Sequence, residues 1–164
     1  MIMTCVFRRT LTSVGPVLSR RSENLKGEKM QAKMCLEIIY PSVDELIETN
    51  RRVLREISVK RAVRHRVLSR PKLEAATQKM RAEEGDLYDK AAVLLTELVR
   101  GHAFASGVRR TAYVATVSFL RTNDEHPSVA HDPRILTGIR EGFYTVEETK
   151  DWLRGNAVRQ FTRT

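Results

Sequence analysis

The sequence contains little cysteine, few aromatic residues and no long apolar run, and each shortage excludes a class of protein. No stretch approaches the roughly 20 apolar residues that a membrane-spanning helix needs, so we expect a soluble protein with no membrane partner. Cys5 and Cys35 are the only cysteines, and neither has a histidine or cysteine at metal-ligand spacing. We therefore expect no disulfide framework and no zinc site. Reduced thiols are typical of a cytoplasmic protein.

The positive charge of the chain is concentrated in its N-terminal part. The formal net charge is +9, and residues 1–70 hold 15 Lys or Arg against 7 Asp or Glu. Residues 71–164 are nearly balanced, with 14 against 13. Such an excess can indicate an anionic partner, nucleic acid included. Because the basic stretch at residues 51–70 has no interleaved aromatic residues, we expect a solvated surface and no nucleic-acid partner. A basic flap beside a nucleotide site is the alternative.

The length of 164 residues suits a single domain, preceded by a stretch of different character. Residues 1–33 carry 7 Lys or Arg against 2 Asp or Glu and have no sustained apolar period. Gly15-Pro16 interrupts any helix there. We expect residues 1–33 to be a disordered leader or an over-extended start, with Met30 and Met34 as alternative starts. Residues 34–158 are expected to form one helical domain.

Apolar residues recur at helical spacing through most of the chain after residue 40. Strand-like alternation is confined to a short run at residues 36–40, so the pattern predicts an all-α fold. No charged residue occurs from Thr111 to Leu120. A helix that is apolar on all sides is buried, which indicates a compact bundle around a central helix at 108–122. The expected helices span about 42–57, 71–84, 86–100, 108–122, 133–141 and 145–153.

The connection between the third and fourth of these helices carries the candidate functional residues. It reads Gly-His-Ala-Phe-Ala-Ser-Gly-Val-Arg-Arg-Thr-Ala from Gly101 to Ala112, with Gly101 as the expected end of the first helix. A helix N-terminus has unpaired N–H groups and partial positive charge, so it favours phosphate. Arg109 and Arg110 add charge in the first turn, and the His102 imidazole titrates near neutrality. The segment predicts a phosphate site with a base beside it.

This segment resembles the signature loop of the Fic/Doc family (Fido domain), most closely that of its Doc toxin branch. Doc-type loops read His-x-Phe-x-Asp-Ala-Asn-Lys-Arg-Thr-Ala, and the His, the Phe, the Arg-Thr-Ala and the spacing match. The sequence Ser-x-x-Glu-Leu-Ile at 42–47 is also similar to the entry helix of Doc-like chains. The resemblance implies a helical fold and a transferase that moves phosphate or AMP from ATP to a protein hydroxyl. It further implies a small antitoxin as partner and a protein substrate such as a translation factor.

The resemblance also implies roles for individual residues. His102 falls on the catalytic base and Phe104 on the aromatic residue that holds the loop in the core. Gly107, Arg109 and Arg110 fall on the phosphate-binding positions, with Arg109 in place of the family's lysine.

Two positions depart from the family pattern. Ser106 stands where the acidic metal ligand is expected, and Val108 stands where an asparagine contacts phosphate. The resemblance implies Mg²⁺ as well as ATP, but a hydroxyl binds this hard cation far less readily than a carboxylate does. Two alternatives therefore stay open. The protein is either a transferase, weakened by these changes, or a non-catalytic protein that keeps the fold and binds an anion or nucleotide.

Overall fold

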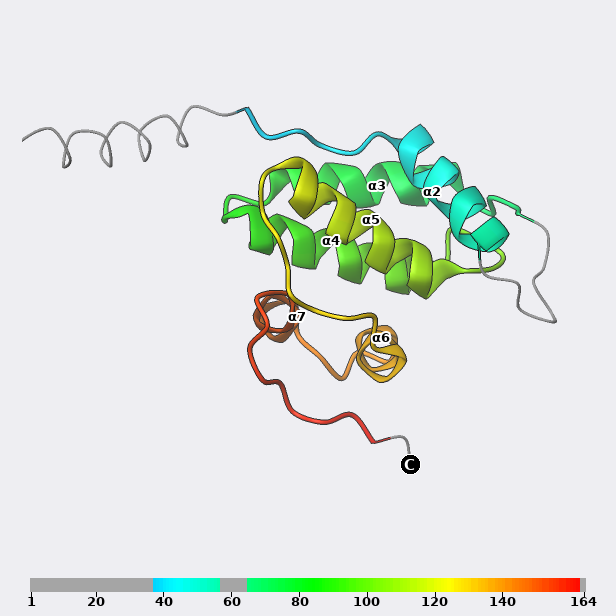
Figure 1. Ribbon diagram of the computed structural model, residues 1–164. Helices are drawn as coiled ribbons and strands as arrows, with labels where there is room; N and C mark the ends of the chain where they lie inside the picture. The colour runs from blue at the N-terminus through cyan, green and yellow to red at the C-terminus, as the bar shows by residue number, and fades with distance from the viewer. Residues whose placement is uncertain (1–36, 57–64, 163–164) are drawn as a thin grey trace, which may run out of the picture. The chain divides into compact units, whose positions relative to one another are not determined.

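The computed structural model describes residues 37–56 and 65–162, and within these ranges the chain is all-helical (Figure 1). No strand is present in the described ranges beyond one isolated bridge, so the predicted all-α fold is confirmed. None of the described helices combines the length and the apolar character needed to cross a bilayer. The helices are α2 (Val43–Glu56), α3 (Arg70–Ala82), α4 (Leu87–Gly101), α5 (Val108–Thr122), α6 (Pro133–Arg140) and α7 (Val146–Leu153).

The helix starts lie within one residue of the predicted positions, and several are fixed by a local side chain. The Asp86 carboxylate accepts from two backbone N–H groups at the start of α4. Thr145 and Glu148 form a reciprocal capping box at the start of α7, as predicted from their spacing. Ser42 and Glu45 make the equivalent contacts before α2. Each cap satisfies N–H groups that the helix itself leaves unpaired.

Helices α4 and α5 share the centre of the bundle. α4 packs against α3, α5, α6 and α7, while α5 packs against α4, α2 and α6. Leu94 and Leu95 of α4 and Leu120 of α5 are fully buried. Each such leucine contributes roughly 1.5–3 kcal/mol through burial alone. The uncharged stretch of α5 is therefore buried on most of its sides, as its composition predicted, and the loop between α4 and α5 joins the two most deeply packed elements.

An arginine at the end of α4 bonds to α6 and to the segment that follows it. Arg100, in the last turn of α4, donates from Nε to the carbonyl of Ile139 at 2.9 Å and from Nη2 to that of Tyr144 at 3.1 Å. A cation at a helix C-terminus offsets the partial negative charge of its free carbonyls. This contact fixes α6 beside the loop that follows α4.

The short alternating run does not form a strand: residues 37–40 have no regular secondary structure. In the described part of the chain, the isolated bridge joins Val67 to Phe104, where residues far apart in sequence meet. The predicted leader at 1–33 and part of the basic stretch, residues 57–64, lie outside the described residues.

Candidate active site

The turn from α4 into the loop is made by His102 rather than by the glycine before it. Gly101 is the last residue of α4, and His102 adopts the left-handed conformation with φ 48° and ψ 44°. The helix ends at Gly101 as predicted, but the left-handed residue that follows it is a histidine and not a glycine. A left-handed conformation costs a non-glycine residue about 1–2 kcal/mol, and such strain is concentrated at functional sites. The side chain of His102 is therefore exposed, and it projects from a backbone position that is fixed and strained.

The loop after His102 is fixed by burial and by backbone pairing. Phe104 is 4% exposed and belongs to the core. The N–H of Leu68 donates to the carbonyl of Ala103 at 2.8 Å, and the N–H of Ala105 donates to the carbonyl of Arg66 at 3.0 Å. Residues 66–68 therefore lie along one side of the loop, and the core lies on the other.

The start of α5 presents free donors. Gly107 is its N-cap with φ 74°, and no side chain caps the helix there. Thr111 donates to the carbonyl of Gly107 at 2.9 Å, which begins the helical ladder. The N–H groups of Val108, Arg109 and Arg110 precede that bond and have no partner within the helix. An uncapped N-terminus of this kind is suited to bind phosphate.

The two arginines of the first turn differ in their surroundings. Arg109 donates from Nη1 to the hydroxyl of Thr137, which in turn donates to the carbonyl of Pro133 within α6. Arg110 lies close enough to His131 for its charge to affect that imidazole. Burial first, and then the positive charge of Arg110, lower the pKa of His131. Arg109 is therefore directed toward α6, and Arg110 remains the more available phosphate ligand.

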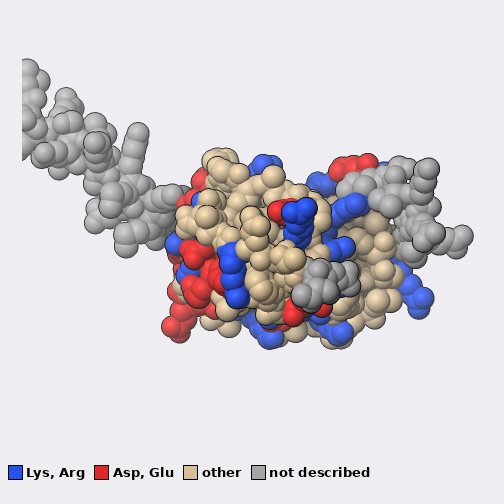
Figure 2. Space-filling model, turned by 90° about the horizontal axis from the view of Figure 1, so that it is seen from below, with Lys and Arg blue, Asp and Glu red and all other residues tan. Residues whose placement is uncertain are grey.

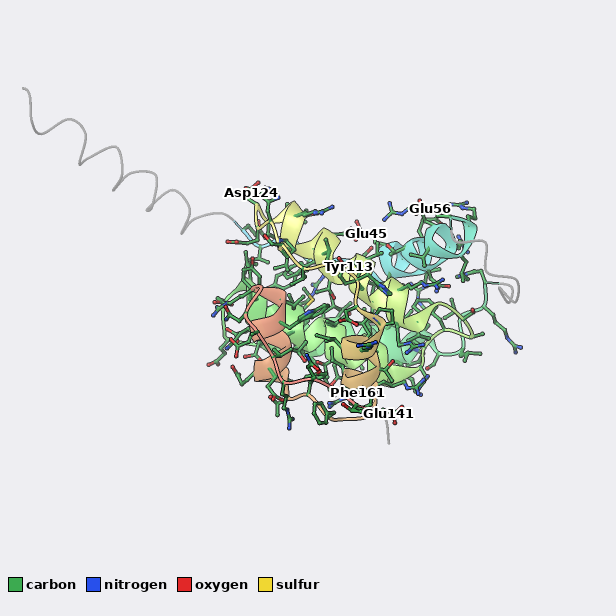
Figure 3. All side chains as sticks on the ribbon, turned by 60° about the horizontal axis from the view of Figure 1, so that its bottom comes forward. Glu45, Glu56, Tyr113, Asp124, Glu141 and Phe161 are labelled. Atoms are coloured by element: carbon green, nitrogen blue, oxygen red, sulfur yellow. The ribbon has the colours of Figure 1, made fainter. Side chains whose placement is uncertain are left out.

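A cavity lies beside α6, on the side of Thr137. It has a volume of about 600 Å³, and Thr137, Arg134 and Phe161 are among its lining residues. Figure 3 labels Phe161 near the end of α6 that Glu141 follows. Thr137, which lines this cavity, also contacts Arg109 in the first turn of α5.

Two site residues were missed by the sequence analysis. Asn50 of α2 is fully buried and bonds both to the carbonyl of Ser106 and to the hydroxyl of Thr111. His65 in turn contacts Asn50, with 2.7 Å between Nδ1 and Oδ1. Burial and the charge of Arg51 lower the pKa of His65. An asparagine in the apolar stripe of α2, between Leu46 and Val53, was the available signal.

Part of the chain that includes this loop matches a known family. Residues 40–120 match the Fic/DOC family model. The Fic/DOC match begins just before α2 and runs through the loop to Leu120, near the end of α5. A search of the curated proteins found no match to the chain.

The loop between α4 and α5 does not fit a magnesium ion. Ser106, which the sequence resemblance places at the acidic ligand, has a hydroxyl and no carboxylate, and its carbonyl accepts from Asn50. Within the described residues, no group of three His, Cys, Asp or Glu side chains is arranged to hold a metal. The apolar side chain of Val108 offers no hydrogen-bond donor. The donors that this loop offers to an anion are therefore backbone N–H groups and arginine.

The described part of the basic stretch is mostly paired at the surface. Arg51 and Arg55 both contact Glu48, and Arg70 contacts Asp44. Exposed pairs of this kind contribute little to stability, and they agree with the expected solvated surface.

Acidic side chains gather toward the left end of the face in Figure 2, the end at which α4 begins. The loop follows the other end of α4, about 20 Å away along the helix.

Proposed function

We propose that this protein is a Fic/Doc-type transferase that moves phosphate or AMP from ATP to a hydroxyl group of a protein. One observation supports this most strongly. An uncapped helix N-terminus with two arginines follows directly on an exposed histidine held at a strained backbone position. The helix N-terminus can bind the phosphates, and the histidine can accept the proton of the acceptor hydroxyl.

In the proposed reaction, His102 accepts the proton of the protein hydroxyl as its oxygen attacks phosphorus. Attack at the γ-phosphorus breaks its bond to the bridging oxygen and releases ADP. Attack at the α-phosphorus releases pyrophosphate. The N–H groups of Val108–Arg110 and the Arg110 guanidinium stabilise the charge on the transferred group. We place the nucleoside in the cavity beside α6, whose size is typical of small-molecule sites.

The resemblance to the Doc branch extends the proposal to partners. We propose a toxin that acts in the cytoplasm on a protein such as a translation factor and that is inhibited by a small antitoxin. The alternative function is non-catalytic binding of a nucleotide or another anion. It is favoured by Ser106 and Val108, and by the contact that directs Arg109 toward Thr137.

Transfer from labelled ATP tests the proposal. Purified protein is incubated with a cell extract and with ATP labelled at the γ- or the α-phosphate, in Mg²⁺ or in Mn²⁺. We expect label on protein, reduced about 100-fold or more in His102→Ala because a general base contributes about that factor. His126→Ala, at an exposed histidine after α5, is the matched control and should transfer normally.

The position of the label separates the two reactions, and binding separates the alternatives. Label from the γ-position means phosphate transfer, and label from the α-position means AMP transfer. ATP binding without transfer, lost in Arg110→Ala, would support the non-catalytic alternative. If the protein transfers no label and binds neither ATP nor pyrophosphate, both proposals are wrong.

A further inference from the structure

Asn50 is a buried amide that uses both of its ends. It is 0% exposed and lies on the face of α2 that packs against α5. Its Nδ2 donates to the carbonyl of Ser106 at 3.0 Å and to Thr111 Oγ1 at 2.9 Å. Its Oδ1 lies 2.7 Å from His65 Nδ1. Burying an amide is costly unless its hydrogen bonds are made, and an apolar residue would pack here without that cost.

The contacts fix the orientation of the amide and the tautomer of the histidine. A backbone carbonyl can only accept, so the atom facing Ser106 must be the nitrogen of Asn50. The oxygen of Asn50 then faces His65, and His65 Nδ1 must carry a proton to donate to it. In neutral His65 the other ring nitrogen, Nε2, is therefore the unprotonated one.

The hydrogen bond from Asn50 to the carbonyl of Ser106 also determines the direction of the N–H group of Gly107. Ser106 C=O and Gly107 N–H belong to one trans peptide unit, in which they point in opposite directions. Because the carbonyl points at Asn50, the N–H of Gly107 points away from α2. A Cβ on Gly107 would lie 3.2 Å from Asn50 Nδ2, so this turn sits directly on the amide.

The same network joins the loop to residues 65–69. His65 contacts Asn50, and the next residue, Arg66, accepts from the N–H of Ala105. The turn at Ser106–Gly107 is therefore held by α2 and by residues 65–69 together. Since Ser106 and Val108 supply neither a carboxylate nor an amide, binding relies on the backbone N–H groups, whose directions depend on this turn.

We propose that Asn50, oriented by His65, is the positioning residue that holds the Ser106–Gly107 turn in its anion-binding shape. The anion-binding part of this proposal rests on the proposed function. Neither residue need touch the nucleotide; both act through the backbone of the loop.

Asn50→Leu tests the proposal because leucine has a similar volume and no hydrogen-bonding groups. The matched control is Asn123→Leu. Asn123 also makes three hydrogen bonds, to Ile39 and Phe119, at the opposite end of α5. Figure 3 shows the neighbouring Asp124 well separated from Glu56, the last residue of α2. We expect the Kd for ATP, measured by calorimetry, to rise about tenfold in Asn50→Leu and less than twofold in the control. Equal affinities in the two variants would overturn the proposal.

His65 provides a second pair of variants at a less buried position. His65→Gln keeps an N–H group that can donate to Asn50 and should retain most of the ATP affinity. His65→Leu cannot donate and should lose affinity as Asn50→Leu does. In the native protein, a long-range ¹H–¹⁵N spectrum at neutral pH should show the proton of His65 on Nδ1. A proton on Nε2 instead, or equal loss in both variants, would overturn the role of His65.

Amide hydrogen exchange separates this proposal from the proposed function. If the native protein binds neither ATP nor pyrophosphate, the proposed function fails, but exchange at Ala105 and Thr111 still reports on the turn. Faster exchange of these amides in Asn50→Leu than in Asn123→Leu would support the positioning role. Unchanged exchange would overturn it.

Discussion

At the scale of single residues, the donors that the loop offers to an anion are backbone N–H groups and arginine. Ser106 and Val108 supply neither a carboxylate nor an amide, and Gly107 leaves the helix start uncapped. Backbone N–H groups are placed by φ and ψ alone, so their geometry depends on the residues that hold the turn. The conformation of Gly107 therefore determines the direction of these donors.

Gly107→Ala should destabilise the protein for two separable reasons. Gly107 has φ 74°, which costs alanine about 1–2 kcal/mol. Its Cβ would also lie 3.1 Å from Leu54 Cδ2 and 3.2 Å from Asn50 Nδ2. Gly142→Ala is the matched control, since Gly142 has φ 78° and nothing within 4 Å of the added Cβ. Denaturant unfolding should show a larger loss for Gly107→Ala; equal losses would mean that the contact with Asn50 imposes no cost.

What the sequence could predict at this scale depended on how local the signal was. His102, Phe104 and Arg110 follow from a motif of nine residues, and the all-helical fold follows from apolar spacing. Asn50 could not be placed, because its partner Ser106 lies 56 positions away. His65 could not be placed either, because it contacts Asn50 from 15 positions away. The contact between Arg109 and Thr137 was missed for the same reason. It depends on how Arg100 holds α6.

At the scale of elements, helix starts were predicted well and pairing between segments was not. Asp86, Thr145 and Glu148 act on N–H groups within three residues, so their spacing alone indicates the start. The bridge between Val67 and Phe104 needs two segments to be brought together by the fold. A pairing that involves only two residues leaves no periodic pattern in the sequence, so the sequence could not predict it.

Asp86→Ala should weaken α4 by about 1 kcal/mol, since alanine cannot accept from the free N–H groups of the first turn. Asp86 also forms an ion pair with Arg154. Asp86→Ser separates the two effects, because serine keeps the cap and loses the charge. Thermal unfolding should place the serine variant close to the native protein. A serine variant as unstable as the alanine variant would assign the loss to the ion pair.

At the scale of the whole molecule, two histidines with lowered pKa values belong to the surroundings of the same loop. His65 is affected by burial and by Arg51, with Glu48 acting in the opposite direction. His131 is affected by burial, Arg110 and Arg109, with Asp132 and its own backbone opposing them. His131 also packs edge-on against Tyr113, 5.2 Å between ring centres, and its Nε2 is buried without a partner among the described residues. Protonation of these histidines at low pH should therefore destabilise the surroundings of this loop.

The stability of the protein should fall as the pH is lowered from 7 toward 5. A histidine near pKa 6.5 in the unfolded chain takes up its proton before the folded one does, because the folded pKa is lower. The unfolded state then holds more protons, so the free energy of unfolding decreases from about pH 6.5 downward, by at most about 1.4 kcal/mol per pH unit for each histidine. Denaturant unfolding at each pH measures this slope. His65→Gln and His131→Gln should each reduce it, whereas His126→Gln, at an exposed position, should leave it unchanged. A slope that survives in the double variant His65→Gln/His131→Gln would show that other groups cause it.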